Sequence, residues 1–194
     1  MSFDAHVTAH ATWNGAPSVI LDRSAFYPES GGQMADRGVL AGARVLDVQI
    51  DDAGLVHHVL DGAAPAVGTA VHGEVDPERR RVHRALHSAQ HLLSRALVDL
   101  CGAETTSSRL GETLCTVDVD RSGLSEAKVA EAERAVLRVV DEDRAVRAWF
   151  PSAEELAALP LRRAPKAHDR IRVVDLGGFD VSPCGGTHVA RTAQ

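Results

Sequence analysis

The chain has 194 residues, of which 44% are apolar and 25% charged, and its formal net charge is −6. This composition is typical of a globular protein and excludes a disordered, collagen-like or coiled-coil chain. The 3 cysteines are too few and too irregularly spaced for a disulfide-built fold. The N-terminus lacks a signal-peptide pattern, and no stretch approaches the roughly 18 apolar residues of a membrane span. We therefore expect a soluble, cytoplasmic protein with no membrane partner.

Short β-type runs separated by glycine, proline, asparagine and aspartate turns fill the first part of the chain. This pattern is typical of a small antiparallel barrel or sandwich, and it requires no helix. We therefore assign residues 1–75 to a small β-barrel-like N-terminal domain. The runs that we expect to form strands lie at residues 6–13, 17–22, 38–50, 54–60 and 69–75.

The pattern changes at Asp76 and Pro77, where a helix-capping residue precedes a proline at the first helical position. From there apolar residues recur at steps of three and four, which predicts an amphipathic helix over residues 77–100. We place the domain boundary here, so that the second domain spans residues 76–194. The apolar stripe of this helix consists of Val82, Leu86, Ala89, Leu93, Ala96 and Leu100.

Strands and helices alternate after this helix. Residues 113–120 alternate as a strand, in which we expect Cys115 to be a small core residue. A capping box at Ser152 and Glu155 starts a short helix. Helices that follow strands on a shared sheet predict an α+β domain, with helices packed on an antiparallel sheet. The other expected elements are helices over 124–146 and 152–159 and strands over 145–150 and 170–176.

Two motifs of histidine and cysteine carry the chemistry of this sequence. His87 and His91 lie four residues apart on the first helix, so their side chains share one face and could chelate one ion. His83 offers a second pair with His87, and solvated or core histidines are the alternative for both pairs. Cys184 and His188 repeat the spacing on a glycine-containing loop. Because thiolate and imidazole together suit Zn²⁺, the two motifs predict one zinc site; a thiolate nucleophile is the alternative role of Cys184.

The two motifs stand in RALHSAQHLL and VVDLGGFDVSPCGGTHVART, and they resemble the editing domain of alanyl-tRNA synthetase and its free-standing relatives, the AlaX proteins. The segment LDRSAFYPESGGQMADRG is similar to the one that precedes the editing site in alanyl-type proteins, whereas threonyl-tRNA synthetase editing domains share only the two motifs. The resemblance covers nearly the whole chain, and 194 residues leave no room for an aminoacylation domain. It implies a trans-acting, ATP-independent aminoacyl-tRNA deacylase that serves translation fidelity.

The implied reaction is hydrolysis of the ester that joins a wrong amino acid to tRNA(Ala). The main expected substrate is Ser-tRNA(Ala), with Gly-tRNA(Ala) as a second candidate. The resemblance implies zinc as the cofactor and all four motif residues as catalytic. His87, His91 and Cys184 are expected to be ligands, and His188 is either the fourth ligand or a base beside a bound water.

Discrimination against alanine needs a group that reads the serine hydroxyl, because serine exceeds alanine by that hydroxyl. The segment after the first helix lacks the glutamine that synthetase editing domains often have there, but it supplies three hydroxyl side chains. A polar loop is the alternative interpretation of these three residues. The candidate substrate-binding residues are Thr106, Ser107, Ser108, Gly185, Gly186 and Thr187.

The implied partner is the acceptor end of tRNA(Ala). A net charge of −6 argues against a general nucleic-acid binder, but arginines gather in residues 78–84 and 161–172. These stretches are either a track for RNA phosphates or a solvated charged face, and the loop at Gly31 is either an RNA contact or a structural turn. Since aromatic residues make up only 4% of the chain, we expect phosphate contacts rather than base stacking to dominate. The candidate tRNA-binding residues are Gly31, Gly32, Gln33, Arg79, Arg80, Arg81, Arg162, Arg163 and Lys166.

Two other functions fit the same residues. A zinc-stabilised RNA-binding module without catalysis is compatible with a closed set of four ligands, because closed sites are usually structural. A metallohydrolase of another small ester or amide is favoured if the acidic surface prevents tRNA binding. Deacylation assays on alanyl, seryl and glycyl forms of the same tRNA distinguish the three.

Overall fold

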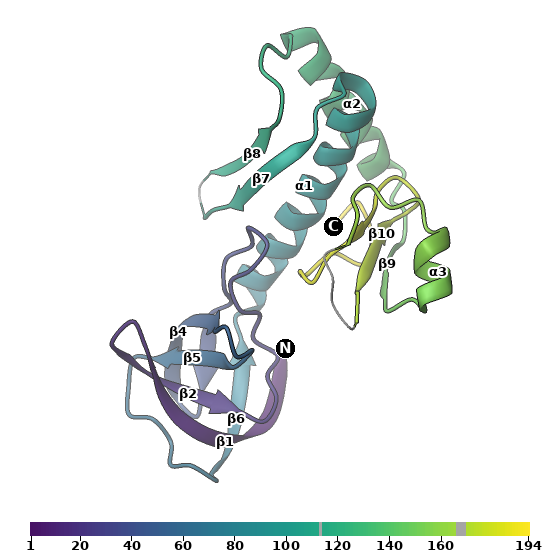
Figure 1. Cartoon of the computed structure of the whole chain (residues 1–194). Helices are drawn as coiled ribbons and strands as arrows, with labels where there is room; N and C mark the ends of the chain where they lie inside the picture. The colour runs from purple at the N-terminus through teal and green to yellow at the C-terminus, as the bar shows by residue number, and fades with distance from the viewer. Residues whose placement is uncertain (113, 166–169) are drawn as a thin grey trace. The chain divides into compact units, whose positions relative to one another are not determined.

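The structure is a computed structural model that describes residues 1–112, 114–165 and 170–194. It confirms the α+β class, with mostly antiparallel sheets and three helices in these ranges. The chain forms two compact units, Met1–Val82 and His83–Gln194 (Figure 1). In the part of the chain that is described, no helix is long and apolar enough to cross a membrane.

Six antiparallel strands build the first unit. They are β1 (Ser2–Trp13), β2 (Ala16–Leu21), β3 (Gly38–Leu40), β4 (Ala43–Ile50), β5 (Val56–Leu60) and β6 (Ala70–Val75). In hydrogen-bonding order β1-β2-β5-β4-β3-β6 they close into a barrel. Side chains alternate along each strand, so every second residue points inward and the apolar ones form the core. Members of this core include Val7, Val19, Leu40, Val45 and Val48.

The remaining elements follow the barrel in the chain. They are α1 (Pro77–Cys101), β7 (Thr105–Leu110), β8 (Cys115–Val119), α2 (Glu126–Asp141), β9 (Val146–Trp149), α3 (Ala153–Ala158), β10 (Val173–Leu176) and β11 (Val181–Pro183). The second unit has two sheets, the hairpin β7-β8 and a three-stranded sheet in the order β11-β10-β9. The sequence does not predict β7, because its residues are polar and become a strand only by pairing with β8.

The start of α1 is held by side chains of the first unit. Asp76 accepts backbone N–H bonds from Glu78 and Arg79 at 2.9 and 3.0 Å, which confirms the predicted cap. Arg80 donates through Nε to both carboxylate oxygens of Asp36 at 3.0 Å, and both side chains are buried. Removing one partner of such a pair would leave an uncompensated buried charge, so the pair anchors the first turn of α1 within the first unit.

Helix α2 is shorter than the predicted helix over 124–146. Ser125 caps its first turn by accepting a bond from the backbone N–H of Lys128. The helix ends at Asp141, and two residues later Asp143 has a φ of 45°, a left-handed conformation that an α-helix cannot include. The predicted helix is therefore too long at its C-terminal end. The apolar periodicity of the sequence continues past Asp141, but the backbone turns there and leaves the helical conformation.

The apolar stripe of α1 is only partly covered. Leu86 and Leu93 line an open groove of about 670 Å³, together with residues of the β7-β8 hairpin and of α2. The predicted alternation of β8 is confirmed, since Val117 and Val119 line the same groove. Cys115 shares this face but is exposed, so its prediction as a core residue is wrong. The face it occupies is apolar yet open.

Candidate metal centre

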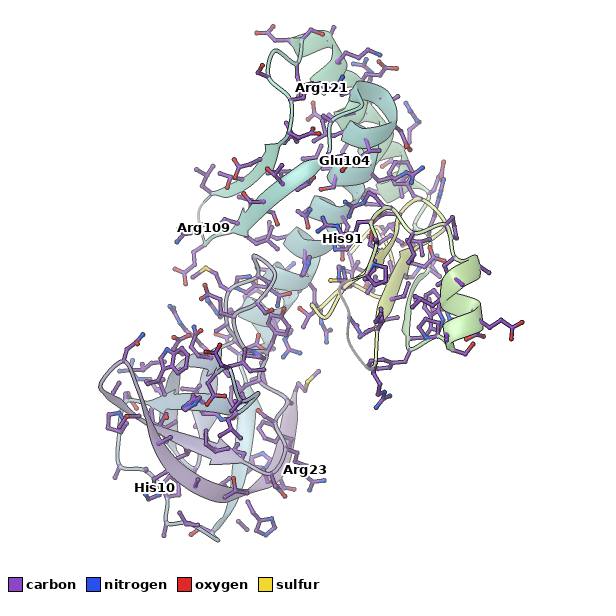
Figure 2. All side chains as sticks on the ribbon, viewed as in Figure 1. His10, Arg23, His91, Glu104, Arg109 and Arg121 are labelled. Carbon is purple, nitrogen blue, oxygen red and sulfur yellow. The ribbon has the colours of Figure 1, made fainter. Side chains whose placement is uncertain are left out.

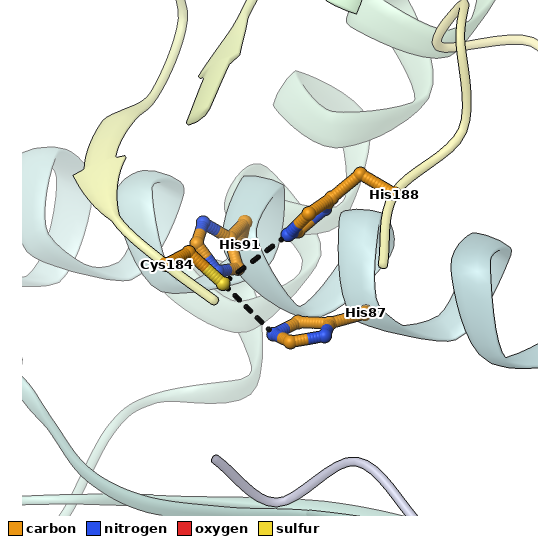
Figure 3. A group of neighbouring side chains, drawn as sticks. All are labelled: His87, His91, Cys184 and His188. Atoms are coloured by element: carbon orange, nitrogen blue, oxygen red, sulfur yellow. Dashed lines mark hydrogen bonds between the residues drawn. The ribbon is translucent and has the colours of Figure 1, made fainter. Parts of the chain in front are cut away.

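Four potential metal ligands converge in the second unit. His87 and His91 lie one turn apart on α1 and are only 3% and 5% exposed; Figure 2 labels His91 on this helix. Cys184 directly follows β11, and His188 lies four residues further along. One donor atom from each residue lies within 4.8 Å of those from the other three (Figure 3). These four residues could therefore hold one metal ion.

The donor atoms are spaced like ligands of a single ion. Cys184 Sγ lies 3.5 Å from His87 Nε2 and 3.3 Å from His188 Nε2 (Figure 3). A sulfur at about 2.3 Å and a nitrogen at about 2.0 Å from one tetrahedral ion are about 3.5 Å apart. The imidazole rings of His87, His91 and His188 have centroid separations of 4.5, 4.8 and 5.2 Å. The chemistry and spacing of this donor set fit Zn²⁺.

A buried carboxylate orients His91. Asp180 is 0% exposed, and its Oδ2 lies 2.9 Å from His91 Nδ1. Arg162 Nε and Ser182 Oγ also donate to this carboxylate, at 2.6 and 2.9 Å. Burial alone would raise the pKa of Asp180, but the bonds from His91 and Arg162 lower it to about 2. An ionised Asp180 accepts a hydrogen bond from the Nδ1–H of His91, so in the neutral ring the lone pair is on Nε2 and can bind an ion.

A hydroxyl group orients His188 in the same way. Ser88 Oγ donates its proton to the carbonyl oxygen of Arg84 at 2.9 Å, so it can only accept from His188 Nδ1, which lies 3.1 Å away. Ser88 also accepts the backbone N–H of Val189 at 3.2 Å. The hydrogen-bond network thus places the proton of His188 on Nδ1 and leaves Nε2, the atom that faces Cys184, as an electron-pair donor.

The loop from Cys184 to His188 contacts the Cys184 sulfur through its backbone and packs closely against His87. The backbone N–H of Gly186 donates to Cys184 Sγ at 3.3 Å. A Cβ atom on Gly186 would lie 2.0 Å from Cε1 of His87, so a larger residue here would displace that ring. Arg172 Nη1 donates to the carbonyl oxygens of Cys184 and Gly186, at 2.8 and 2.9 Å, and closes the loop.

The electrostatics of this group favour the metal-binding forms of Cys184 and His188. Burial lowers the pKa of His91, but its hydrogen bonds with Asp180 and Cys184 outweigh burial and raise that pKa, so an incoming cation has to displace a proton from His91. Burial alone would raise the pKa of the Cys184 thiol, but hydrogen bonds with His188, His87 and His91 lower it to about 2. Burial lowers the pKa of His188 to about 4. Near neutral pH, Cys184 is therefore a thiolate and His188 is neutral, which are the forms that coordinate metal.

The predicted substrate contacts face different directions. Ser107 is exposed and its hydroxyl donates to Asp118 across the hairpin. Ser108 is half-buried and pairs with Val117, on the face that lines the groove. Thr106 is exposed on the same strand. Gly185, Gly186 and Thr187 lie between the two C-terminal ligands.

Three of the predicted tRNA contacts are buried in the fold. The side chains of Arg80 and Arg162 are buried in ion pairs with Asp36 and Asp180, and Gln33 is also buried. A buried guanidinium that is already paired with a carboxylate cannot reach an RNA phosphate without breaking that pair. The predictions for Arg80 and Arg162 are therefore corrected, and both residues are assigned to the folded framework. The buried side chain of Gln33 is likewise part of the barrel unit, and contact of its loop with RNA stays a prediction.

The other predicted tRNA contacts that the structure describes are more accessible. Gly31 and Gly32 have φ values of 58° and 84° and form a two-residue turn, so a structural turn explains both glycines. Arg79 is half-buried and donates to the carbonyl oxygen of Ala35. Arg81 is exposed and paired with Glu78, and Arg163 is exposed in the second unit. Lys166 lies outside the described residues.

The two ligand motifs do not identify Asp180 and Ser88, which orient two of the ligands. Ser88 follows His87 directly, and Asp180 precedes Cys184 by four residues, so a polar side chain near each motif was the available signal. Closeness in the sequence does not predict which histidine a polar side chain contacts, or which of its ring nitrogens. Contacts across the unit decide that, since Asp180 orients a histidine of α1 and Ser88 orients one of the C-terminal loop.

Comparisons with protein families match both ends of the chain. Residues 3–79 match the family described as tRNA synthetases class II (A). Residues 171–194 match the threonyl and alanyl tRNA synthetase second additional domain. The second match includes Cys184 and His188, whereas His87 and His91 lie outside both matched ranges.

Individual relatives cover most of the chain. It is 33% identical to the alanyl-tRNA editing protein AlaX-L of Pyrococcus horikoshii, over 91% of this chain and 45% of that one. It is 31% identical to AlaX-M of Methanosarcina acetivorans, over 91% of this chain and 79% of that one. It is 36% identical to the alanine–tRNA ligase of Pyrococcus furiosus, over 90% of this chain and 20% of the ligase. The chain thus spans about half of AlaX-L and a fifth of the ligase.

Proposed function

This chain belongs to the AlaX-type alanyl-tRNA editing proteins, and we propose that it hydrolyses the aminoacyl ester of mischarged tRNA(Ala) in trans. Ser-tRNA(Ala) is the main substrate in this proposal, and Gly-tRNA(Ala) is the second. The observation that carries the proposal is the convergence of His87, His91, Cys184 and His188 within 4.8 Å. The names of the relatives supply the substrate class, and the donor set supplies a means of ester hydrolysis.

Zinc is the proposed cofactor, held by the three imidazoles and the thiolate. When bound, Zn²⁺ would polarise an ester carbonyl or lower the pKa of a water toward about 7, which requires that it accept one such oxygen in addition to the protein side chains. The 3.3 Å separation of His188 Nε2 from Cys184 Sγ favours His188 as the fourth ligand over a free base. Asp180 and Ser88 hold His91 and His188 in the tautomers that direct Nε2 to the centre.

Ser108 is the proposed reader of the substrate hydroxyl. It lies on the groove-facing side of β7, whereas Ser107 on the other side is already bonded to Asp118. A hydroxyl that donates to or accepts from the serine side chain would lose that partner when alanine occupies the site. Such an unpaired polar group discriminates between substrates by as much as about 10⁴-fold.

The decisive experiment measures deacylation of Ser-, Gly- and Ala-tRNA(Ala) side by side with zinc-loaded protein. We expect the seryl ester to be cleaved and the alanyl ester to be spared by a factor of about 100 or more. Ser108→Ala should reduce this ratio, whereas the matched control Ser107→Ala should keep it. Equal cleavage of the seryl and alanyl esters would refute the proposed specificity.

A closed set of four ligands is also the geometry of structural zinc, and this favours a second candidate, an RNA-binding module without catalysis. The same assay separates the two functions. Zinc-loaded protein that binds tRNA(Ala) but leaves all three esters intact would support the binding module and exclude the deacylase.

A further inference from the structure

Two adjacent aromatic side chains at the end of β9 each lie beneath an arginine. The guanidinium carbon of Arg147 is 4.5 Å from the centroid of the Trp149 ring. That of Arg170 is 4.4 Å from the centroid of the Phe150 ring. We call these four residues the Arg–aromatic patch. It lies in the second unit, where β9 is an outer strand of the three-stranded sheet (Figure 1).

The patch exposes aromatic surface in a chain that has little of it. Aromatic residues make up only 4% of the sequence, yet two of them are consecutive here. Phe150 is 53% exposed, and it is the one aromatic ring among the exposed large apolar side chains of the described residues. Arg147 and Arg170 are exposed as well. A guanidinium that lies over an aromatic ring leaves its outer side available to a planar ligand.

These arginines differ in their partners from the half-buried Arg95 and Arg144. Arg95 is paired with Asp99 at 2.8 Å, and Arg144 is paired with Glu142 at 2.6 Å. Within the described ranges, Arg147 and Arg170 contact aromatic rings and form no ion pair with a carboxylate. Their positive charge is therefore available to an anionic ligand. A ligand that is both planar and anionic matches the surface, and unpaired nucleotides have these two properties.

We propose that the Arg–aromatic patch binds unpaired nucleotides of RNA, with bases stacked on Phe150 and on the guanidinium of Arg147 and with phosphates near both arginines. The identity of this RNA as the single-stranded end of tRNA(Ala) rests on the proposed function. The sequence predicts that phosphate contacts dominate RNA binding, and the patch would add base stacking to them.

Trp149 provides a direct test, because the chain has only 2 tryptophans. Trp13→Phe leaves Trp149 as the single fluorescent reporter, and stacking of bases on the patch should quench it. The probes are uncharged tRNA(Ala) and a short single-stranded RNA with the sequence of its 3′ end. We expect both to quench saturably. In this background Phe150→Ala should weaken binding about 5- to 100-fold, whereas Phe150→Tyr should retain it.

Arg95→Gln is the matched control, since it removes one half-buried arginine that is paired with a carboxylate rather than stacked. Its effect on the dissociation constant should be less than about twofold at moderate salt. Equal weakening by Phe150→Ala and Arg95→Gln, or no effect of Phe150→Ala, would overturn the proposal. Equal quenching by a polyglutamate peptide would also overturn the proposal, because the patch would then bind acidic polymers in general rather than RNA. Circular dichroism confirms that each variant is folded.

The outcome is separable from that of the proposed function. Normal quenching by RNA without deacylation would overturn the deacylase and leave the patch supported. Normal deacylation with an unchanged dissociation constant for Phe150→Ala would overturn the patch and leave the deacylase supported.

Discussion

The two units use buried histidines in opposite ways. In the barrel, His57 Nδ1 lies 3.1 Å from Ser18 Oγ, and its Nε2 lies 3.0 Å from Asp51 Oδ2. The neighbouring His58 contacts the hydroxyl of Ser24 through Nε2, at 2.7 Å, and a backbone carbonyl through Nδ1, at 3.1 Å. All four ring nitrogens therefore have partners within the barrel, so neither histidine is left to bind an ion.

In the second unit, His91 and His188 are each held by the protein through Nδ1. The other nitrogen of each ring is directed toward the donor group that also contains Cys184. Burial and hydrogen bonding are therefore common to both units. The metal centre differs because Nε2 of each oriented ring is directed toward a common position beside the Cys184 thiolate, where one metal ion could bind.

The largest expected effect comes from removing a ligand. Cys184→Ala and His91→Ala should each reduce deacylation by roughly 100-fold or more, because metal binding and orientation are lost together. His57→Ala removes an equally buried histidine from the barrel and should lower stability without changing the zinc content. Elemental analysis and deacylation rates, measured on folded protein, check both expectations. A catalytically normal, zinc-free Cys184→Ala would contradict the comparison.

Asp180→Asn should have a smaller effect on zinc than loss of a ligand. Asparagine keeps the shape of the side chain but lacks the negative charge that strengthens the hydrogen bond from His91 Nδ1. The affinity for zinc should therefore fall about 10- to 100-fold. Asp51→Asn is the matched control, since Asp51 contacts His57 at 3.0 Å just as Asp180 contacts His91 at 2.9 Å. Competition with a chromophoric chelator measures both variants. A similar loss of affinity in the two would mean that the carboxylate acts through stability alone.

Burial of His58 should make the stability of the barrel depend on pH. Burial lowers the pKa of His58 from 6.5 to about 4, so the folded barrel favours the neutral ring. Between pH 6.5 and 4, His58 is protonated in the unfolded chain but neutral in the folded barrel. The unfolding free energy is therefore unaffected by His58 above pH 6.5 and falls as the pH decreases toward 4. The loss from this one group is about 3 kcal/mol. Urea unfolding, followed through Trp13 in a Trp149→Phe chain, measures it.

His58→Gln removes the titrating group and should make the unfolding free energy less dependent on pH between 6.5 and 4. Zinc content at neutral pH should be the same as in the parent chain. An equally steep pH dependence in this variant would show that other groups cause the loss of stability.

The sequence by itself determined the features that depend on local spacing. Residues four apart on a helix share a face, so His87 and His91 are paired by α1 wherever that helix packs. The cap at Asp76 and the alternation of the barrel strands are local in the same sense. The convergence of the helix pair with the Cys184 loop was predictable only because two ligand motifs occur in one chain.

Tertiary structure decided what each polar side chain meets. Arg80 and Arg162 stand in basic stretches of the sequence, yet each is buried against a carboxylate 44 or 18 residues away. β7 is a strand because β8 pairs with it, and Cys115 is exposed because the groove beside it is open. Asp180 and Ser88 select the ring nitrogens that face the metal centre. These properties follow from contacts between distant parts of the chain, which no local pattern of residues encodes.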